Sequence, residues 1–255
     1  MTQKDSKKKA IVIMPAYNVG AVLKKTIGMI PAGCVDEIIV INDGSTDDTV
    51  AVAQSLGVSV VSHAKSYGYG AVQKTGYKEA LKRGADYVVM VHGDNQYDPT
   101  LVPEFLKKIE NEGYDVVTGS RMIIGDVLKN GMPLWKFIPN RFLTWLENTV
   151  FETNITDYHN GYRAFTAEFL HKIPLDILSD KFDFDTDILI QAAIRHARIA
   201  EIAHQTRYED ENSQMSFKKA VRYGLMIMVT VFHYTLHKAG IWKQKAFEIK
   251  HVKVG

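Results

Sequence analysis

The chain has 255 residues, of which 46% are hydrophobic and 24% are charged, and its formal net charge is +2. This length and composition predict one large α/β domain with a full hydrophobic core. The small net charge argues against nucleic acid as a partner, and the single cysteine, Cys34, excludes an internal disulfide and a multi-cysteine zinc site.

The chain begins with a basic stretch. Residues 1–9 hold four lysines and lack the apolar core of a secretion signal. We expect this stretch to be a disordered tail, and we expect the protein to be cytoplasmic.

Strand-like and helix-like segments then alternate as far as Arg121. The strand-like segments are short, apolar and β-rich. In the stretches between them, apolar residues recur every three or four positions, which predicts helices. The predicted strands cover 10–14, where Pro15 ends the first, then 38–41, 58–62, 87–91 and 115–118. This alternation indicates a mostly parallel sheet covered by helices on both faces.

The alternation breaks after Arg121. A loop rich in glycine and proline over 124–139 is expected to precede a helix over 140–151. Further elements are a strand at 162–165, a helix at 184–197 and a strand at 199–203. This second half is where we expect an acceptor to bind.

The segment 216–255 is basic and contains one apolar helical stretch. It holds eight lysines and arginines against one acid, Glu248, and residues 225–232 are all uncharged and mostly apolar. Eight residues are too few to cross a hydrocarbon core, which takes about 20. We predict an amphipathic helical extension that lies at an anionic membrane surface. Packing on the core and homodimerisation are the alternatives.

The most informative motif follows the apolar run 87–91. In an extended chain the side chains of His92, Asp94 and Gln96 point the same way, and the end of a parallel strand is where α/β sheets hold ligands. An imidazole, a carboxylate and an amide oxygen could therefore converge on one cation. This arrangement predicts a metal that holds a phosphorylated substrate.

Five short motifs together resemble family 2 glycosyltransferases with the GT-A fold, a Rossmann-like α/β fold. They occur in the family's order and at predicted strand ends or helix starts. The motifs are Pro15-Ala16-Tyr17-Asn18, Asn42-Asp43-Gly44-Ser45-Thr46-Asp47, Gly68-Tyr69-Gly70-Ala71, Gly93-Asp94-Asn95-Gln96 and Gly119-Ser120-Arg121. One such motif is weak evidence, but five in sequence are strong.

Two later motifs resemble dolichyl-phosphate mannose synthases and bacterial polyprenyl-phosphate glycosyltransferases. They are Asn160-Gly161-Tyr162-Arg163 and the run 207–213. The resemblance implies inverting transfer of a sugar from a UDP- or GDP-sugar to a polyprenyl phosphate with Mg²⁺ or Mn²⁺. It also implies a catalytic domain over 10–215, with a nucleotide-sugar half (10–121) and an acceptor half (122–215), peripheral on the cytoplasmic face of a membrane.

The resemblance assigns the nucleotide-sugar site to the first strand ends. The backbone of Pro15, Ala16 and Asn18 and the ring of Tyr17 would hold the base, while Asp43 accepts hydrogen bonds from base or ribose. The further residues assigned to this site are Ser45, Gly70, Gly93 and Asp94. Ordinary turn chemistry is the alternative explanation for Asn42 to Ser45.

Two positions depart from the family pattern. His92 stands where related synthases usually carry an aspartate, so it is either a softer metal ligand that favours Mn²⁺ or a structural histidine. Val19 stands where the family often has a glutamate that contacts the nucleoside, which argues against guanine as the base. Asp94 is the first choice as metal ligand, with Gln96 next.

The resemblance also assigns three arginines to phosphates, because their placement is similar to that of arginines near the phosphates in the family. Arg121 and Arg141 would lie near the donor phosphates, and Arg207 would hold the acceptor phosphate; surface ion pairs are the alternative. A phosphate acceptor is already ionised, so no protein base is required. For a hydroxyl acceptor on a glycan or protein, Asp185 or Asp187 would be the base, unless they only cap a helix. A non-catalytic nucleotide-sugar-binding protein is the remaining alternative.

Overall fold

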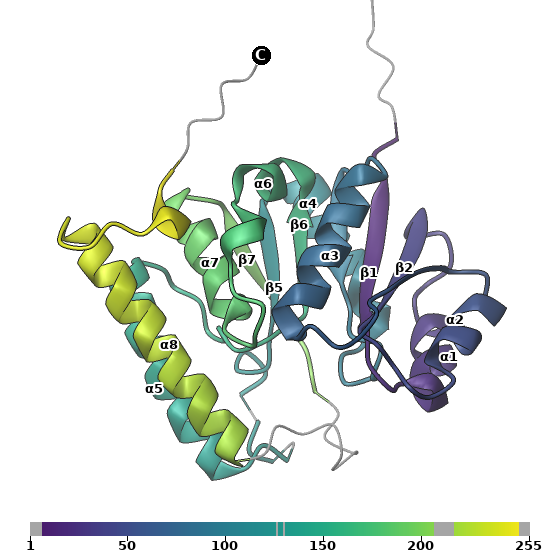
Figure 1. The fold of residues 1–255 in the computed structure, drawn as a ribbon, viewed down its shortest axis with the longest axis horizontal. Coiled ribbons are helices and arrows are strands. Elements are labelled where there is room, and N and C mark those ends of the chain that lie inside the picture. Colours follow the sequence, from purple (N-terminus) through teal and green to yellow (C-terminus); the bar gives the residue numbers. More distant parts are fainter. Residues whose placement is uncertain (1–6, 126, 130, 207–216, 250–255) are drawn as a thin grey trace, which may run out of the picture.

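A seven-stranded sheet forms the centre of the computed structural model, which describes residues 7–125, 127–129, 131–206 and 217–249 (Figure 1). The spatial order is β3-β2-β1-β4-β6-β5-β7. The strands are β1 (Ala10–Ala16), β2 (Glu37–Asn42), β3 (Ser59–Ser62), β4 (Tyr87–Met90), β5 (Val116–Ser120), β6 (Arg163–Thr166) and β7 (Ile199–Ala203). Only β6 runs antiparallel to its neighbours, so the predicted, mostly parallel α/β sheet is confirmed.

Helices cover both faces of this sheet. They are α1 (Gly20–Gly28), α2 (Thr49–Ser55), α3 (Tyr69–Lys82), α4 (Val102–Glu112), α5 (Leu134–Phe151), α6 (Ala167–Lys172), α7 (Phe184–Ile194) and α8 (Phe217–Lys238). Along β1, Ile11 and Ile13 join the core under α3 and α7, while Val12 and Met14 join the core under α1 and α4. This alternation is the side-chain period of a strand buried on both faces.

The helices α5 and α8 lie alongside each other and run in the same direction (Figure 1). Their first turns meet where the rings of Trp135 and Phe217 lie 5.4 Å apart, and their last turns meet where Phe151 and Tyr234 lie 5.1 Å apart. The predicted C-terminal helix is therefore present, with α5 as its partner. No helix in the described ranges is long and apolar enough to span a bilayer.

Two prolines lie inside elements that the sequence predicted to begin or end at them. β1 continues through Pro15, which has no N–H to donate but whose carbonyl accepts from Gly93 N at 3.0 Å, beyond the end of β4. α5 begins at Leu134 rather than at Asn140, with Pro139 in its second turn. The helix gives up one hydrogen bond at that position.

The short helix α6 was not predicted from the sequence.

Gly76 allows α3 to pack closely on the sheet. A Cβ at this position would lie 2.8 Å from Ile13 Cδ1, 3.1 Å from Ile13 Cβ and 3.2 Å from Ile41 Cγ1. We expect Gly76→Val to lower the free energy of unfolding by about 1–3 kcal/mol because it overpacks this contact. Urea unfolding would measure the change.

Gly28→Val is the matched control, since a Cβ on Gly28 has no atom within 4 Å. Its effect should stay within about 0.5 kcal/mol. Equal unfolding midpoints for the two variants would contradict the close contact between α3 and the sheet.

Candidate functional site

One cavity of about 630 Å³ extends from the carboxyl ends of β4 and β5 to the groove between α5 and α8. Five predicted site residues line its polar end: His92, Asp94, Gln96, Arg121 and Asp185. Its other end is apolar and is formed mainly by Trp135, Phe142, Leu143, Phe217, Val221, Leu225 and Met228. The cavity therefore joins a charged region to a hydrophobic one.

The turn after β4 is held against the end of β1. Gly93 N donates to Pro15 O at 3.0 Å, and a Cβ on Gly93 would lie only 3.2 Å from that same carbonyl oxygen. Asp94 Oδ1 accepts from Gln96 N at 3.1 Å, with Asn95 between them in the left-handed region at φ 60°. These contacts fix the backbone that carries His92, Asp94 and Gln96 into the cavity.

The donor set of this turn fits a cation shared with a diphosphate. Among the described residues, no group of three or more His, Cys, Asp or Glu side chains is placed to hold a metal ion. His92, Asp94 and the Gln96 amide nevertheless share the cavity. Mg²⁺ and similar cations are commonly held by one or two carboxylates together with substrate phosphates, which is the arrangement these residues allow.

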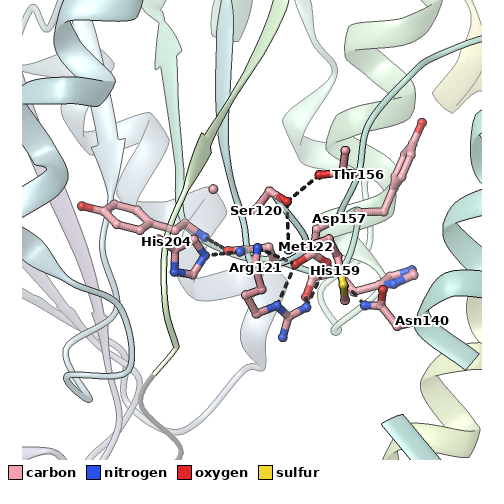
Figure 2. Close-up of polar contacts among 12 residues, drawn as sticks. Ser120, Arg121, Met122, Asn140, Thr156, Asp157, His159 and His204 are labelled. Atoms are coloured by element: carbon pink, nitrogen blue, oxygen red, sulfur yellow. Dashed lines mark hydrogen bonds and ion pairs between the residues drawn. The ribbon is translucent and has the colours of Figure 1, made fainter. Parts of the chain in front are cut away.

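A buried ion pair holds Arg121 at the end of β5 (Figure 2). Its Nε donates to Asp157 Oδ2 at 2.7 Å and its Nη2 to Asp157 Oδ1 at 2.9 Å. Nη2 also donates to His159 O at 2.7 Å, and Asn140 of α5 donates to Asp157 Oδ1 at 3.3 Å. Burial alone would raise the pKa of Asp157, but the charge and hydrogen bonds of Arg121 hold it well below its usual range.

A second layer of polar contacts supports this pair from behind. The Ser120 and Thr156 hydroxyls are hydrogen-bonded to each other (Figure 2). His204 accepts from Asn160 Nδ2 at Nε2 and lies within 3.1 Å of Gln205 O at Nδ1, so Nδ1 carries its proton. Burial lowers the pKa of His204 to about 4, and the ring is therefore neutral at physiological pH.

Only one of the two candidate bases lines the cavity. Asp185 accepts from Tyr69 Oη at 2.9 Å and pairs with Arg163 at 3.1 Å. Burial raises its pKa despite the nearby Arg163 charge. Asp187 instead accepts from Ser179 N at 2.9 Å, and burial raises its pKa to about 6. Asp187 does not line the cavity, so it is not placed to act as the base there.

The residues assigned to the nucleotide lie next to this cavity, at the ends of β1 and β2. Asn18 N donates to Ser45 Oγ at 2.9 Å, and Asn18 Oδ1 accepts from Thr46 N at 2.8 Å. Tyr17 is exposed beside them. The two predicted motifs, Pro15 to Asn18 and Asn42 to Asp47, are thus tied into one loop pair. Their contacts with a nucleotide stay a prediction.

Asp43 and the two glycines after β3 make contacts within the protein. Asp43 accepts from His63 Nδ1, Ser66 Oγ, Tyr67 N and Gly68 N at 2.6 to 3.2 Å, and these bonds lower its pKa against the effect of burial. Gly70 N donates to Asp180 O at 2.9 Å, and a Cβ on Gly70 would lie 2.3 Å from Ser179 O. At these two glycines the backbone therefore lies close to the segment before α7.

One predicted arginine does not line the cavity, and another lies outside the described residues. Arg141 is on α5 but is exposed, and its Nη1 donates to Thr156 O at 3.3 Å. Arg141 is not among the residues that line the cavity, and its contact with the donor phosphates stays a prediction. Arg207, with the rest of the motif 207–213, lies outside the described residues.

The cavity also contains residues that the sequence analysis did not assign. Tyr69 and Tyr97 flank His92, with ring centroids 5.5 and 4.9 Å from it. Lys136 is beside Arg121, and burial together with the Arg121 charge lowers its pKa. Tyr69 lies inside the Gly68 to Ala71 motif, and Tyr97 directly follows Gln96. Their closeness to these motifs in the sequence is the feature that could have assigned both tyrosines to the site.

Comparison with known proteins identifies relatives along most of the chain. The model of the family described as glycosyl transferase family 2 matches residues 11–173. An uncharacterised protein of Methanocaldococcus jannaschii is 33% identical over 80% of this chain and 84% of its own length. The UDP-N-acetylglucosamine–dolichyl-phosphate N-acetylglucosaminyltransferase of Methanococcus voltae is 27% identical over 78% of this chain and 86% of its own length.

A solved structure shares the fold. Glucosyl-3-phosphoglycerate synthase from Mycobacterium tuberculosis, in complex with UDP, superposes with a TM-score of 0.71 and 21% identity over 92% of this chain and 82% of that one. The same enzyme has been solved with Mn²⁺, UDP and glucosyl-3-phosphoglycerate, at a TM-score of 0.64. This likeness confirms the predicted GT-A fold.

The ion pair of Asp157 should make the free energy of unfolding decrease at acidic pH. A carboxyl whose pKa is lowered by folding stabilises the protein fully above its unfolded pKa, about 3.9, and loses that contribution as the pH falls toward its folded pKa. We expect the unfolding free energy of the wild type to fall more between pH 5 and pH 3 than that of Asp157→Asn, by about 1 kcal/mol. Urea unfolding across this range measures the difference.

Glu110→Gln is the control, because it removes an exposed carboxyl on α4. Its unfolding free energy should fall between pH 5 and pH 3 by as much as that of the wild type. An Asp157→Asn protein that folds and retains the full acid sensitivity of the wild type would show that this pair does not contribute it.

Proposed function

The chain belongs to glycosyltransferase family 2, and on that premise we propose that it moves one sugar from a nucleotide diphosphate sugar to a polyprenyl phosphate, such as dolichyl or undecaprenyl phosphate. The proposed reaction inverts the anomeric carbon and uses Mg²⁺ or Mn²⁺. The relative from Methanococcus voltae is named for a UDP-sugar donor and a dolichyl-phosphate acceptor, and Val19 argues against guanine. A UDP-sugar is therefore the favoured donor.

The observation that carries the proposal is the two-ended cavity. Its polar end holds Asp94, Gln96 and Arg121, and its apolar end is lined by side chains of α5 and α8. A polyprenyl phosphate has the same division, with a dianionic head and a hydrocarbon tail. Burying the tail would be favourable by about 0.8 kcal/mol per CH₂, and the head would then lie beside Arg121.

The donor would occupy the other side of the polar end. Pro15 to Asn18 and Ser45 form the loop pair proposed for the base and ribose, and Gly93 holds the next turn against Pro15. Asp94 and Gln96, with His92 lining the same cavity, would hold the cation through the Asp94 carboxylate and the Gln96 amide oxygen, and the cation would supply positive charge to a departing diphosphate. Asp43 accepts from Gly68 N and so positions the segment that carries this glycine. Asp43 would also accept hydrogen bonds from the base or ribose.

The proposed chemistry requires little proton transfer. An oxygen of the acceptor phosphate attacks the anomeric carbon, the bond from that carbon to the diphosphate oxygen breaks, and its electron pair leaves with the nucleoside diphosphate. The acceptor phosphate is already ionised near pH 7. The Arg121 guanidinium, held by Asp157, contributes fixed positive charge near the phosphates, and such preorganised charge is the main contribution that this reaction needs from the protein.

The test is transfer from a UDP-sugar to a short polyprenyl phosphate with Mn²⁺. We expect glycolipid product that is lost in chelator, and a fall in kcat/KM of about 10²–10³ for Asp94→Ala, because charge stabilisation of the leaving group is removed. Asp98→Asn is the matched control, since its carboxylate caps Thr100 and does not line the cavity. Its rate should stay within about twofold of the wild type. Undiminished product from Asp94→Ala would contradict the assignment.

One observation supports a second acceptor class. Asp185 lines the cavity and its pKa is raised by burial, as a general base for a glycan or protein hydroxyl would require. Product on hydroxyl acceptors alone, with none on polyprenyl phosphate, would favour this alternative. Binding of a UDP-sugar without transfer to any acceptor would instead favour a non-catalytic binding protein.

An apolar face surrounds the open side of the cavity. Exposed apolar residues recur every three or four positions on both helices, which places them on one side of each helix. The α5–α8 apolar face consists of Leu134, Ile138, Phe142, Trp145, Phe217, Val221, Leu225, Met228 and Phe232. Exposed patches of this kind mark interaction sites.

We propose that this face rests on the cytoplasmic surface of a membrane. Arg141, Lys218, Lys219 and Arg222 are exposed on the same two helices, and each basic residue near an anionic leaflet contributes about 1 kcal/mol. The apolar walls of the cavity continue into this face through Phe142, Phe217 and Leu225. A lipid acceptor could therefore enter the cavity from the bilayer without crossing water.

Liposome flotation tests the surface. Trp145 and Phe232 belong to the apolar face but do not line the cavity. The double variant Trp145→Gln/Phe232→Gln should bind anionic liposomes about tenfold more weakly, because two aromatic rings no longer leave water. Ile177→Gln replaces another exposed apolar side chain, outside the two helices, and should bind like the wild type.

Turnover of a short-chain, water-soluble acceptor should be unchanged in the double variant, which separates membrane binding from catalysis. Unchanged liposome binding together with dissociation of a dimer would show that the face is an interface between two copies instead.

A further inference from the structure

His92 is held by two tyrosines at the polar end of the cavity. Its ring lies at 5.5 Å from Tyr69 and 4.9 Å from Tyr97, and its Nε2 is 3.3 Å from Tyr69 Oη. A Cβ on Gly161 would lie 3.0 Å from that same nitrogen and 2.4 Å from Tyr69 Oη. The cluster is therefore closed on the Nε2 side, and the imidazole has little freedom to turn.

The hydrogen bonds of Tyr69 decide which ring nitrogen carries the proton. Tyr69 Oη donates its single proton to Asp185 Oδ2 at 2.9 Å. The 3.3 Å contact with His92 can then be a hydrogen bond only if His92 Nε2 carries a proton and donates to the phenol oxygen. In the neutral imidazole this leaves the lone pair on Nδ1. Within the described residues no hydrogen bond to Nδ1 is present.

Asp185 is itself held in place, so the chain of contacts is anchored. Arg163, which is fully buried, lies 3.1 Å from Asp185 Oδ1 and also donates to Asp185 O at 2.9 Å. Phe182 stacks on the Tyr69 ring at 5.0 Å. Arg163 thus holds Asp185, Asp185 holds Tyr69, and Tyr69 orients the imidazole of His92 through its Nε2.

Metal-binding histidines show the same arrangement. A histidine that binds a metal through one ring nitrogen almost always donates its other N–H to an oxygen acceptor, which fixes the tautomer and the ring orientation. We propose that His92 binds the divalent cation through Nδ1, with Tyr69 and Asp185 as positioning residues. This inference rests on the proposed function, because it assumes a cation at Asp94, and it assigns His92 as a ligand rather than a structural histidine.

The test is electron paramagnetic resonance of Mn²⁺ bound to the full chain with UDP, which needs no turnover. A directly coordinated imidazole gives a ¹⁴N hyperfine coupling, which should change to a ¹⁵N coupling in protein labelled with ¹⁵N-histidine. His92→Asp should still bind Mn²⁺ but lose the nitrogen coupling. It should also lower the ratio of Mn²⁺ to Mg²⁺ affinity, because a carboxylate is a harder ligand than imidazole.

Tyr69→Phe removes the hydroxyl group that accepts from His92 and donates to Asp185, and it leaves the aromatic ring in place. We expect it to keep the nitrogen coupling while weakening Mn²⁺ binding about tenfold, as the loss of such supporting contacts does elsewhere. Tyr67→Phe is the matched control, since Tyr67 is exposed nearby with its ring edge on His63, and it should bind Mn²⁺ like the wild type.

The outcomes separate the two proposals. Mn²⁺ that binds the wild type with UDP but shows no nitrogen coupling would overturn the assignment of His92 and leave the glycosyltransferase proposal intact. The absence of any Mn²⁺ binding in the presence of UDP would overturn both this inference and the cation in the proposed reaction.

Discussion

The ion pair between Arg121 and the buried Asp157 is the interaction on which the site depends. Through it, the end of β5, the loop before β6 and Asn140 on α5 meet at one carboxylate. A buried carboxylate is stable only when it is paired and hydrogen-bonded, so these three segments are held at fixed distances. Arg121 and Asn140, which this pair holds together, both line the two-ended cavity, one from the sheet and one from α5.

Much of the fold and part of the site follow from local sequence patterns. Apolar β-rich segments alternating with helical periodicity predict the parallel sheet. Because parallel strands end at the same edge, side chains that follow different strands converge without any knowledge of long-range contacts. This is why Asp94 and Gln96, which follow β4, could be assigned to a site at this edge. Arg121, which follows β5, was assigned through the family resemblance, and the structure places all three in the cavity.

The parts that could not be predicted depend on contacts between distant segments. Tyr69 and Asp185 are 116 positions apart and meet only because α3 packs against α7. The predicted helix that carries Arg141 is present, but the direction of this exposed side chain depends on how α5 packs against the rest of the chain, which local sequence does not reveal. The glycines near α3 are needed where the backbone of Ser179 and Asp180 passes close by, a packing requirement that local sequence does not reveal.

The central claim is that one cavity receives both the phosphate and the tail of a polyprenyl phosphate. A farnesyl phosphate with a diazirine at the end of its tail tests this claim most directly, through photo-crosslinking and peptide mapping in the presence of UDP and Mn²⁺. The account predicts labelling of α5 and α8 residues that line the cavity, such as Leu143 and Leu225, with protection by unlabelled polyprenyl phosphate but not by polyprenol. Labelling confined to other surfaces, or protection by polyprenol alone, would contradict it.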